Sequence, residues 1–379
     1  MIIGLDAHTI GSNLGGNETY AYNLFLALAS VDQRNEYRLY FTRDSEKLRT
    51  LAAAPNFSLV PIRPHTPYLR IPFALPLELA RRPVDVLHVQ YVPPPFTRTP
   101  LVVMIHDLAV LHSRAFFTRR EHWRNRILLP WAARKAARVL TGSEWCREDI
   151  ERTLGVPASK VVVTYHGIDA RFRPVAAGTT GAVLARYGIT RPYLLSVGNI
   201  QPRKNLRGVL DAFVTLKKEH GLPHRLVVVG KRAWLFGDVF ERVRELGLES
   251  DVTFTGYVPD DDLPAIYSGA EVLVYPSFFE GFGLPPLEAM ACGVPVVASR
   301  EPAFPEILGD AALLADPADP SDIARLVLAA LSDRVLRAGL IEKGIARASR
   351  YTWEKSARRT LAVFESVVAA APGGTARRR

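Results

Sequence analysis

Residues 279–299 read FEGFGLPPLEAMACGVPVVAS and predict a loop, a short helix, a turn and a strand. Pro285 and Pro286 suit the first turn of a helix, and Gly293 suits the position just past its end. The glycine-rich turn and the helix N-terminus both present backbone N–H groups, which attract a phosphate or diphosphate. Glu280 and Glu288 add carboxylates that accept hydrogen bonds from sugar hydroxyls. A glutamate near a helix start can also serve the helix dipole, so Glu288 alone decides nothing.

The length and composition of the chain indicate a soluble protein with two domains. Its 379 residues are enough for two separate cores. The two cysteines, Cys146 and Cys292, show no metal-binding spacing, so we expect a reducing, cytoplasmic compartment. Neither a signal-peptide pattern nor an apolar run of membrane-spanning length is apparent.

Short apolar runs alternate with helical or loop segments, which predicts mostly parallel sheets covered on both faces. In the N-terminal half the runs are 2–5, 37–41, 57–61, 84–89, 101–105, 139–141 and 161–165. In the C-terminal half they are 193–197, 226–230, 252–255, 271–276 and 294–298. We predict an N-terminal domain over 1–172, a linker rich in small residues over 173–190, a C-terminal domain over 191–350, a final helix over 351–370 and a disordered tail over 371–379.

Histidines and glycines follow several N-terminal strands at their carboxyl ends, where parallel sheets bind ligands. A single histidine is usually structural, but two at strand ends favour a site. The loop after the first strand adds adjacent glycines, which let backbone approach a ligand closely, although a plain tight turn explains them equally well. The candidates in this half are His8, Gly15, Gly16, His106, Asp107 and His166.

Two adjacent cations, Arg203 and Lys204, follow the strand 193–197 at the start of a helix. Such a pair suits a diphosphate, although exposed Arg-Lys pairs are common. The Asp-Asp-Asp run 260–262 imitates an Asp-x-Asp metal motif. Because Leu263, Pro264 and a helical run follow, we interpret it as an N-cap cluster and predict no catalytic metal.

A basic segment, 114–138, holds eight Arg or Lys residues and one acid, Glu121, within a chain of net charge +10. Trp123, Ile127, Leu128 and Trp131 fall at helical spacing there. Either this stripe packs on the core, with the arginines solvated, or the segment contacts anionic lipid or guides a lipid-linked diphosphate. We expect no nucleic-acid partner, because no stacking platform or known module accompanies the charge.

Taken together and in order, these motifs resemble the retaining glycosyltransferases of family 4, which have the GT-B fold. Glu280 and Glu288 match the family's Glu-x7-Glu signature, and EILGDAALLADP at 306–317 is similar to bacterial mannosyltransferases of O-antigen and exopolysaccharide synthesis. The resemblance implies an α/β protein of two Rossmann-like domains with a cleft between them. It also implies a C-terminal helix that crosses back to the N-terminal domain.

The resemblance assigns roles to residues that match the family's motifs. Glu280 and His106 would be catalytic. Asn199 stands where the family usually has an Arg, and Arg203 is the cation that can replace its charge. The donor-binding residues would be Gly15, Gly16, Arg203, Lys204, Gly256, Val258, Phe282, Gly283, Leu284 and Glu288, with Glu288 on the ribose. His8, Asp107 and His166 would be acceptor or accessory residues.

We therefore predict a retaining, metal-independent glycosyltransferase with no cofactor besides its nucleotide-sugar donor. The best candidate donor is GDP-mannose, and the acceptor is a saccharide or lipid-linked saccharide in cell-surface polysaccharide or glycolipid assembly. We expect a cytoplasmic protein, which is peripheral at the inner face of the membrane if 114–138 contacts lipid. The alternatives are a UDP-sugar donor, a related epimerase or phosphorylase, or a non-catalytic polyanion binder. A glycoside hydrolase fits poorly, because it needs no phosphate cradle.

Overall fold

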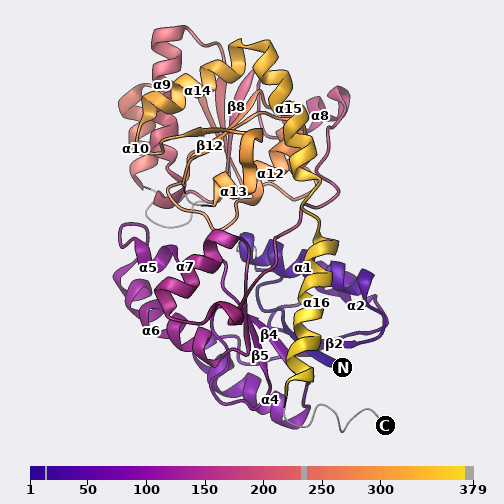
Figure 1. Cartoon of the computed structure of the whole chain (residues 1–379). Coiled ribbons are helices and arrows are strands. Elements are labelled where there is room, and N and C mark those ends of the chain that lie inside the picture. The colour runs from indigo at the N-terminus through magenta and orange to yellow at the C-terminus, as the bar shows by residue number, and fades with distance from the viewer. Residues whose placement is uncertain (13–14, 232–236, 302, 372–379) are drawn as a thin grey trace. The chain divides into compact units, whose positions relative to one another are not determined.

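The computed structural model describes residues 1–12, 15–231, 237–301 and 303–371 and divides into two compact units (Figure 1). Unit 1 contains Met1–Gly167 and continues from Thr352 on, and unit 2 contains Ile168–Tyr351. Each unit is an α/β domain built on one parallel sheet. This confirms the predicted fold class of two Rossmann-like domains. The predicted disordered tail lies, from residue 372 on, outside the described residues.

The sheet of unit 1 has seven strands in the order β3-β2-β1-β4-β5-β6-β7. Its strands are β1 (Ile2–Asp6), β2 (Glu36–Phe41), β3 (Phe57–Pro61), β4 (Val86–Gln90), β5 (Leu101–Met104), β6 (Arg138–Thr141) and β7 (Val161–Val163). Its α-helices are α1 (Gly16–Val31), α2 (Glu46–Ala52), α3 (Pro67–Leu69), α4 (Leu75–Arg81), α5 (Ala109–His112), α6 (Arg119–Lys135), α7 (Glu144–Leu154) and α16 (Trp353–Ala369). A π-helical turn, η1 (Arg70–Ala74), joins α3 to α4, and a 3₁₀ turn, η2 (Ala158–Lys160), precedes β7.

The sheet of unit 2 has six strands in the order β10-β9-β8-β11-β12-β13. They are β8 (Tyr193–Val197), β9 (Arg225–Val229), β10 (Val252–Gly256), β11 (Val272–Tyr275), β12 (Val296–Ser299) and β13 (Leu313–Ala315). The α-helices are α8 (Ala177–Arg186), α9 (Leu206–His220), α10 (Gly237–Leu246), α11 (Leu263–Gly269), α12 (Leu284–Ala291), α13 (Phe304–Leu308), α14 (Pro320–Ser332) and α15 (Arg334–Ala348). The 3₁₀ turns are η3 (Pro202–Lys204) and η4 (Gly309–Ala311).

The segment 173–190, which we expected to be a linker, instead contains helix α8. Thr180, Val183 and Leu184 form the buried face of this helix, and α8 packs against α11. The exposed side carries Gly178 and Gly181, which made the composition look flexible. The segment is therefore part of the packed body of unit 2.

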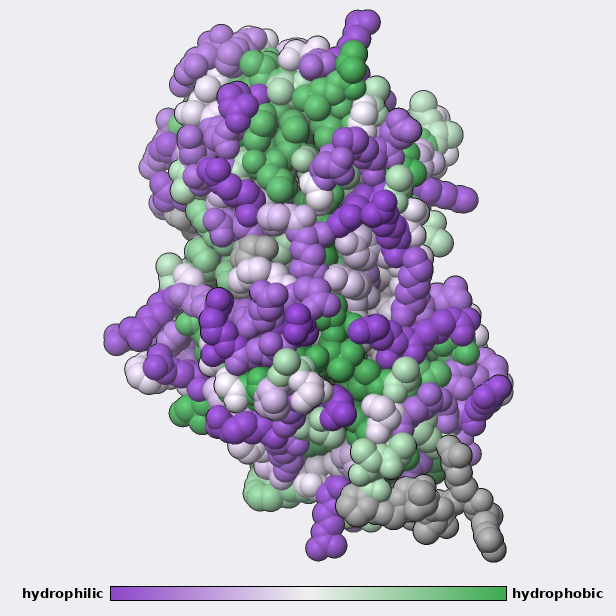
Figure 2. Space-filling model, in the orientation of Figure 1, coloured by the Kyte–Doolittle hydropathy of each residue, from purple (hydrophilic) through white to green (hydrophobic). Residues whose placement is uncertain are grey.

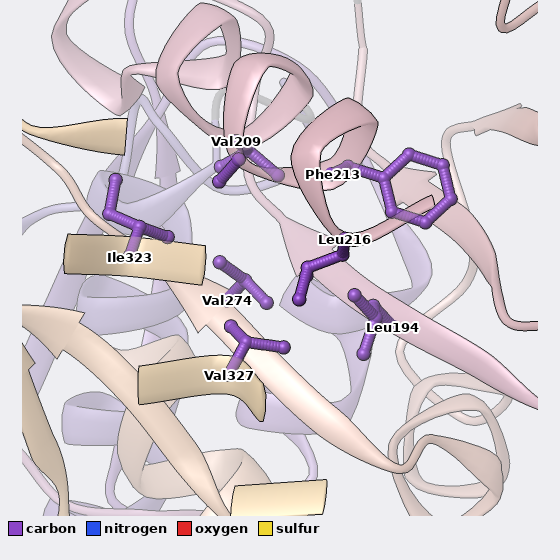
Figure 3. A pocket seen from close by; sticks show the side chains of 8 residues that line it. Leu194, Val209, Phe213, Leu216, Val274, Ile323 and Val327 are labelled. Atoms are coloured by element: carbon purple, nitrogen blue, oxygen red, sulfur yellow. The ribbon is translucent and has the colours of Figure 1, made fainter. Parts of the chain in front are cut away.

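Hydrocarbon side chains fill the space between the sheet of unit 2 and helices α9 and α14. Figure 3 shows the side chains that surround a small gap among them. The gap is lined by Leu194, Val209, Ala212, Phe213, Leu216, Val274, Ile323 and Val327. With no polar side chain to orient a ligand, it is a packing gap rather than a binding site.

The surface carries both polar and apolar residues. Figure 2 shows green, hydrophobic residues between purple, hydrophilic ones on the visible face of each unit. Within the described residues, none of the helices combines the length and the apolar character that a bilayer crossing requires.

The last helix, α16, returns to unit 1 and packs against α1. Phe364 and Ala357 are buried in the same core as Phe25. At the start of α16, the Trp353 ring stacks on the His166 ring with centroids 5.9 Å apart. The predicted return of the final helix to the N-terminal domain is thus confirmed, and its first turn covers a candidate site residue.

Gly167 should be essential for this packing. A Cβ at Gly167 would lie 2.0 Å from the backbone nitrogen of Trp353, so Gly167→Ala must displace α16. We expect the free energy of unfolding to fall by about 2 kcal/mol or more, measured by urea unfolding with tryptophan fluorescence. Gly181→Ala is the matched control: its Cβ meets nothing, and alanine favours α8, so a gain of about 0.5–1 kcal/mol is expected. Equal effects of the two substitutions would contradict the close packing at Gly167.

Candidate functional site

The loop after β11 leads directly into α12, as the sequence predicts. Gly283 has φ of 82°, and a Cβ there would lie 2.3 Å from Cε1 of Phe304, so only glycine fits. Leu284 begins the helix, with prolines in its first turn, and Gly293 follows its end with φ of 77°. The N-terminus of α12 therefore lies immediately beside the loop that carries Glu280.

The turn η3 is fastened to this loop by several hydrogen bonds. The Phe278 backbone N–H donates to the Arg203 carbonyl oxygen at 2.9 Å, and Arg203 Nη1 donates to the Phe279 carbonyl oxygen at 2.6 Å. Asn205, in the left-handed region, accepts from the Gly208 N–H and donates to the Pro276 carbonyl oxygen at 3.1 Å. These bonds fix the two cations of the turn against the Glu280 loop.

Glu280 is a buried carboxylate held between both cations. Its Oε1 lies 2.6 Å from Lys204 Nζ and 3.2 Å from Arg203 Nη1, and the Tyr275 hydroxyl donates to it at 3.4 Å. Burial raises the pKa of Glu280, but the charges of Arg203 and Lys204 outweigh it and bring the pKa below its usual value. Two cations against one ionised carboxylate leave a net positive charge, which suits a diphosphate.

Glu288 lies on α12 in a contrasting environment. It is buried and accepts a hydrogen bond from the Tyr267 hydroxyl at 2.8 Å. Burial raises the pKa of Glu288 to about 7, with a further upward contribution from the charges of Asp260 and Asp169. This carboxyl group is therefore close to half protonated at neutral pH.

The acidic run 260–262 does not cap a helix through its side chains, which corrects our interpretation. Asp262 occupies the N-cap position of α11 but makes no side-chain cap bond. It accepts instead from Arg186 Nη2 at 2.7 Å and from the Tyr187 hydroxyl at 2.6 Å, while Asp261 pairs with Arg171. The two bonds of Asp262 anchor the end of α8. In the described part of the chain, no group of three or more His, Cys, Asp or Glu is placed to hold a metal ion.

His106 and His166 lie together in unit 1, at the carboxyl ends of β5 and β7. His106 Nε2 is 2.8 Å from Gln90 Oε1, and His106 Nδ1 is 3.3 Å from His166 Nε2. With the Gln90 amide nitrogen donating to the Asn17 carbonyl oxygen, Gln90 Oε1 accepts, so His106 is protonated at Nε2. Both ring nitrogens of His106 are thus bonded within the protein.

Burial keeps this histidine pair neutral. It lowers the pKa of His106 well below the usual range, with the neighbouring His166 and His88 adding to the effect, and it lowers the pKa of His166 to about 3. A neutral His106 whose nitrogens are both engaged is poorly suited to transfer a proton.

The remaining N-terminal candidates lie along the same edge of the sheet. His8 Nδ1 is 2.9 Å from Asp6 Oδ1, and Asp107 Oδ1 accepts from the Ala109 N–H at 3.1 Å. Gly15 has φ of 75°, which requires glycine, whereas a Cβ at Gly16 would meet no described atom within 4 Å. The space over Gly16 is therefore open at the start of α1.

The other donor-binding candidates of unit 2 differ in their exposure to solvent. Gly256 has φ of 69°, and Val258 is buried. Between them, Tyr257 is exposed, with Lys231 Nζ 4.6 Å from its ring centroid. Phe282 is buried edge-to-face against Tyr351. Leu284 is half-buried.

The structure adds three residues that the sequence argument missed. Tyr275 ends β11 and Gln90 ends β4, so the rule that selected His106, a polar group at a strand's carboxyl end, could have found both. Tyr267 lies within α11, and no local sequence signal marks it as the partner of Glu288.

Comparisons with known proteins match each half of the chain to a glycosyltransferase family. The model described as Glycosyltransferase Family 4 matches residues 14–172, and that of Glycosyl transferases group 1 matches residues 186–347. The chain is 38% identical over 228 residues to O-antigen chain mannosyltransferase B from Escherichia coli, covering 60% of each protein. It is 27% identical over 271 residues to serotype-specific mannosyltransferase WbdA from Escherichia coli, covering 69% of this chain and 33% of that protein.

The solved structures include proteins of the same fold. Sucrose-phosphate synthase from Thermosynechococcus elongatus aligns with a TM-score of 0.78 at 21% identity, covering 98% of this chain and all of that one. The matches to the two mannosyltransferases span 60% and 33% of those proteins' own lengths.

The buried Glu288 should make stability depend on pH. Its folded pKa of about 7 exceeds the value of about 4.3 expected when unfolded, so stability falls as pH rises between these values. Glu288→Gln removes this loss. We expect the variant to match the wild type near pH 4.5 and to exceed its free energy of unfolding by about 3 kcal/mol above pH 7.

Chemical denaturation across that pH range measures the effect, with the exposed Glu249→Gln as the control. A stability difference between Glu288→Gln and wild type that does not change with pH would contradict the raised pKa.

Proposed function

Because this chain belongs to the glycosyltransferases that join a family 4 domain to a group 1 domain, we propose that it is a retaining mannosyltransferase. It takes mannose from GDP-mannose without a metal ion. It delivers the sugar to a saccharide or lipid-linked acceptor in the synthesis of a cell-surface polysaccharide or glycolipid.

The observation that carries this proposal is the cluster of Lys204, Arg203 and Glu280 beside the N-terminus of α12. A leaving nucleoside diphosphate gains negative charge as the glycosidic bond breaks. Two fixed cations and the backbone N–H groups of a helix N-terminus stabilise such charge without reorganisation. This supports departure of the diphosphate without a metal ion.

The reaction exchanges one bond at the anomeric carbon for another. The bond between this carbon and the diphosphate oxygen breaks, a bond to the acceptor oxygen forms, and the acceptor proton must go to a base. Glu280 is ion-paired and its pKa is lowered despite burial, while both ring nitrogens of His106 are engaged. The leaving phosphate is then the available base, which places the acceptor on the same face and favours retention.

Glu280 and Glu288 take different parts in this scheme. The ionised Glu280 accepts hydrogen bonds from sugar hydroxyls and favours positive charge at the reacting carbon. Glu288 accepts from the ribose hydroxyls, which needs the ionised form of a group whose pKa is about 7. The choice of mannose rests on the similarity to two mannosyltransferases, and a UDP-sugar donor is the alternative.

Substitutions at the two glutamates should separate turnover from binding. With GDP-mannose in buffer containing EDTA, we expect Glu280→Gln to lower kcat about 100-fold or more with little change in GDP affinity. Glu288→Gln should weaken GDP binding about tenfold at pH 8 through loss of charge-assisted hydrogen bonds. Steady-state kinetics and calorimetric titration measure these effects, and NMR of the product should show the donor's anomeric configuration.

Glu249→Gln, an exposed change on the same unit, should leave all three readouts unchanged. Full activity of both site variants would refute the site assignment. Loss of wild-type activity in EDTA with recovery on Mn²⁺ addition would refute metal independence, and an inverted product would refute retention.

We also propose that unit 1 contacts an anionic membrane surface through the basic segment 114–138. The buried side of α6 is formed by Leu129, Ala132 and Ala133. Trp123 and Ile127 lie outside this side, and their side chains are 55% and 68% exposed. The single acid, Glu121, is used in a capping box with Thr118. The exposed face thus combines apolar side chains with arginines, as interfacial helices do.

A second exposed segment adjoins this helix. Arg120 Nη2 donates to the Tyr68 hydroxyl at 2.9 Å, which places the α3–α4 region beside the start of α6. Four of its large apolar side chains are exposed, namely Tyr68, Leu69, Phe73 and Leu77. Apolar groups from two elements therefore adjoin the basic helix.

Vesicle binding tests this surface. We expect the wild type to pellet with phosphatidylglycerol vesicles more than with phosphatidylcholine vesicles, and combined Trp123→Ser and Ile127→Ser to reduce that binding several-fold. Val335→Ser removes an exposed apolar side chain from unit 2 and should change nothing. Equal pelleting with neutral and anionic vesicles would rule the proposal out.

A further inference from the structure

Arg70 is a buried arginine with little compensation for its charge. The residue is 6% exposed, and its Nη1 makes one long hydrogen bond, 3.4 Å, to the His65 carbonyl oxygen. Its Nε is buried without a hydrogen-bond partner, and no carboxylate of the described chain lies within ion-pair distance of it. A guanidinium removed from water is costly unless it is paired, so this group is poised for an anion.

Arg70 lies near the edge of the sheet where ligands bind in such folds. It begins η1, in the connection that follows β3. Its hydrogen bond to His65 ties it to the connection that leaves the carboxyl end of β3. In agreement with this, burial raises the pKa of Asp6, at the end of β1, but His8 and the charge of Arg70 bring it below the usual value. That end of β1 leads into the glycine loop before α1.

Asp6 is already engaged by another residue. It accepts from the His8 backbone N–H at 3.2 Å, and the His8 ring nitrogen Nδ1 lies 2.9 Å from the same oxygen. Since Asp6 makes no ion pair with Arg70 within 4 Å, the charge of the guanidinium is not compensated by this carboxylate, and its unpartnered Nε is left for a phosphate oxygen.

The residues around Arg70 in sequence face the other way. Tyr68, Leu69 and Phe73 are exposed, while the arginine between them points inward. The exposed apolar side chains therefore do not decide the ligand, and both a phosphate joined to an apolar group and a soluble phosphate fit a buried cation.

We propose that Arg70 binds a phosphate group of the acceptor at the carboxyl edge of the unit 1 sheet. Describing this ligand as the acceptor rests on the proposed function, whereas anion binding by Arg70 does not. Arg70 belongs to unit 1, whereas Arg203 and Lys204 belong to unit 2.

Calorimetric titration with inorganic pyrophosphate tests the proposal. The full-length protein is used in a Lys204→Ala background, which removes binding at the donor site. We expect Arg70→Gln to weaken the remaining binding about tenfold or more and Arg70→Lys to weaken it less, because a lysine keeps the charge but not the fork. Arg81→Gln removes an exposed charge from nearby α4 and should have no effect. Equal affinity in the Arg70→Gln and Arg81→Gln proteins, or no binding before substitution, would overturn the proposal.

Melting curves separate anion binding from a structural role. If Arg70 binds phosphate, inorganic phosphate raises the melting temperature of the Lys204→Ala protein but not of its Arg70→Gln derivative. If Arg70 only supports the fold, Arg70→Gln lowers the melting temperature and leaves the response to phosphate unchanged, which would contradict the proposal.

Titration with a second ligand distinguishes a lipid-linked phosphate from a soluble one. Dodecyl phosphate, used below its micelle concentration, should bind more tightly than inorganic phosphate in an Arg70-dependent manner if the acceptor is lipid-linked. Equal, Arg70-dependent affinities support a soluble phosphorylated acceptor. None of these titrations involves sugar transfer, so failure of the Arg70 site and failure of the proposed activity are distinguishable.

Discussion

The ion pairing of Glu280 with Lys204 and Arg203 is the interaction on which the candidate site depends. A carboxylate buried here is tolerated because two cations and a tyrosine hydroxyl surround it, and removing the carboxylate would leave both cations without their ion pair to it. The cations in turn are positioned by backbone hydrogen bonds between η3 and the loop after β11, and by Asn205. Gly283 then lets the chain turn into α12 against Phe304.

The second glutamate of the same stretch, Glu288, has a raised pKa, whereas the pKa of Glu280 is lowered. Glu288 is buried with a hydroxyl donor but makes no ion pair with any described residue, and burial raises its pKa to about 7. Its ionised form is therefore held at a cost to stability, which a proton relieves and which ribose hydroxyls would relieve in the proposed function. Such a cost at a binding position is the usual exchange of stability for function. Arg70 in unit 1 has the same character with the opposite sign of charge.

Much of the fold could be predicted from the periodicity of apolar residues and from the positions of glycines and prolines. The strands at 57–61 and 193–197 were placed to the residue, and the loop, helix and strand of 279–299 were correct, because prolines, glycines and β-branched runs are local signals. Helix α8 was missed since its two exposed glycines hid a buried face whose partner, α11, is distant in sequence. Strand β13 was missed because a strand of three residues is too short to show a periodicity.

The site could be predicted where the type of residue alone indicates which ligand group it binds. Arg203, Lys204 and Glu280 were expected near a diphosphate, and the structure brings them together. Asp262 was placed correctly at the start of α11, but its side chain bonds Arg186 and Tyr187 of another helix, which no local rule foresees. Likewise the engagement of both His106 nitrogens depends on Gln90 and His166, which approach it only through the sheet order.

A melting-temperature screen against GDP, UDP, ADP and their sugar conjugates shows whether the folded protein binds a nucleotide-sugar donor and which one. A ligand that binds only the folded protein stabilises it by about 2.7 kcal/mol at roughly a hundred times its dissociation constant. For a domain of this size that corresponds to a shift of about 5 °C or more. The account predicts such a shift with GDP and GDP-mannose, which Lys204→Ala should largely remove. No shift with any nucleotide, or an equal shift in Lys204→Ala, would contradict it.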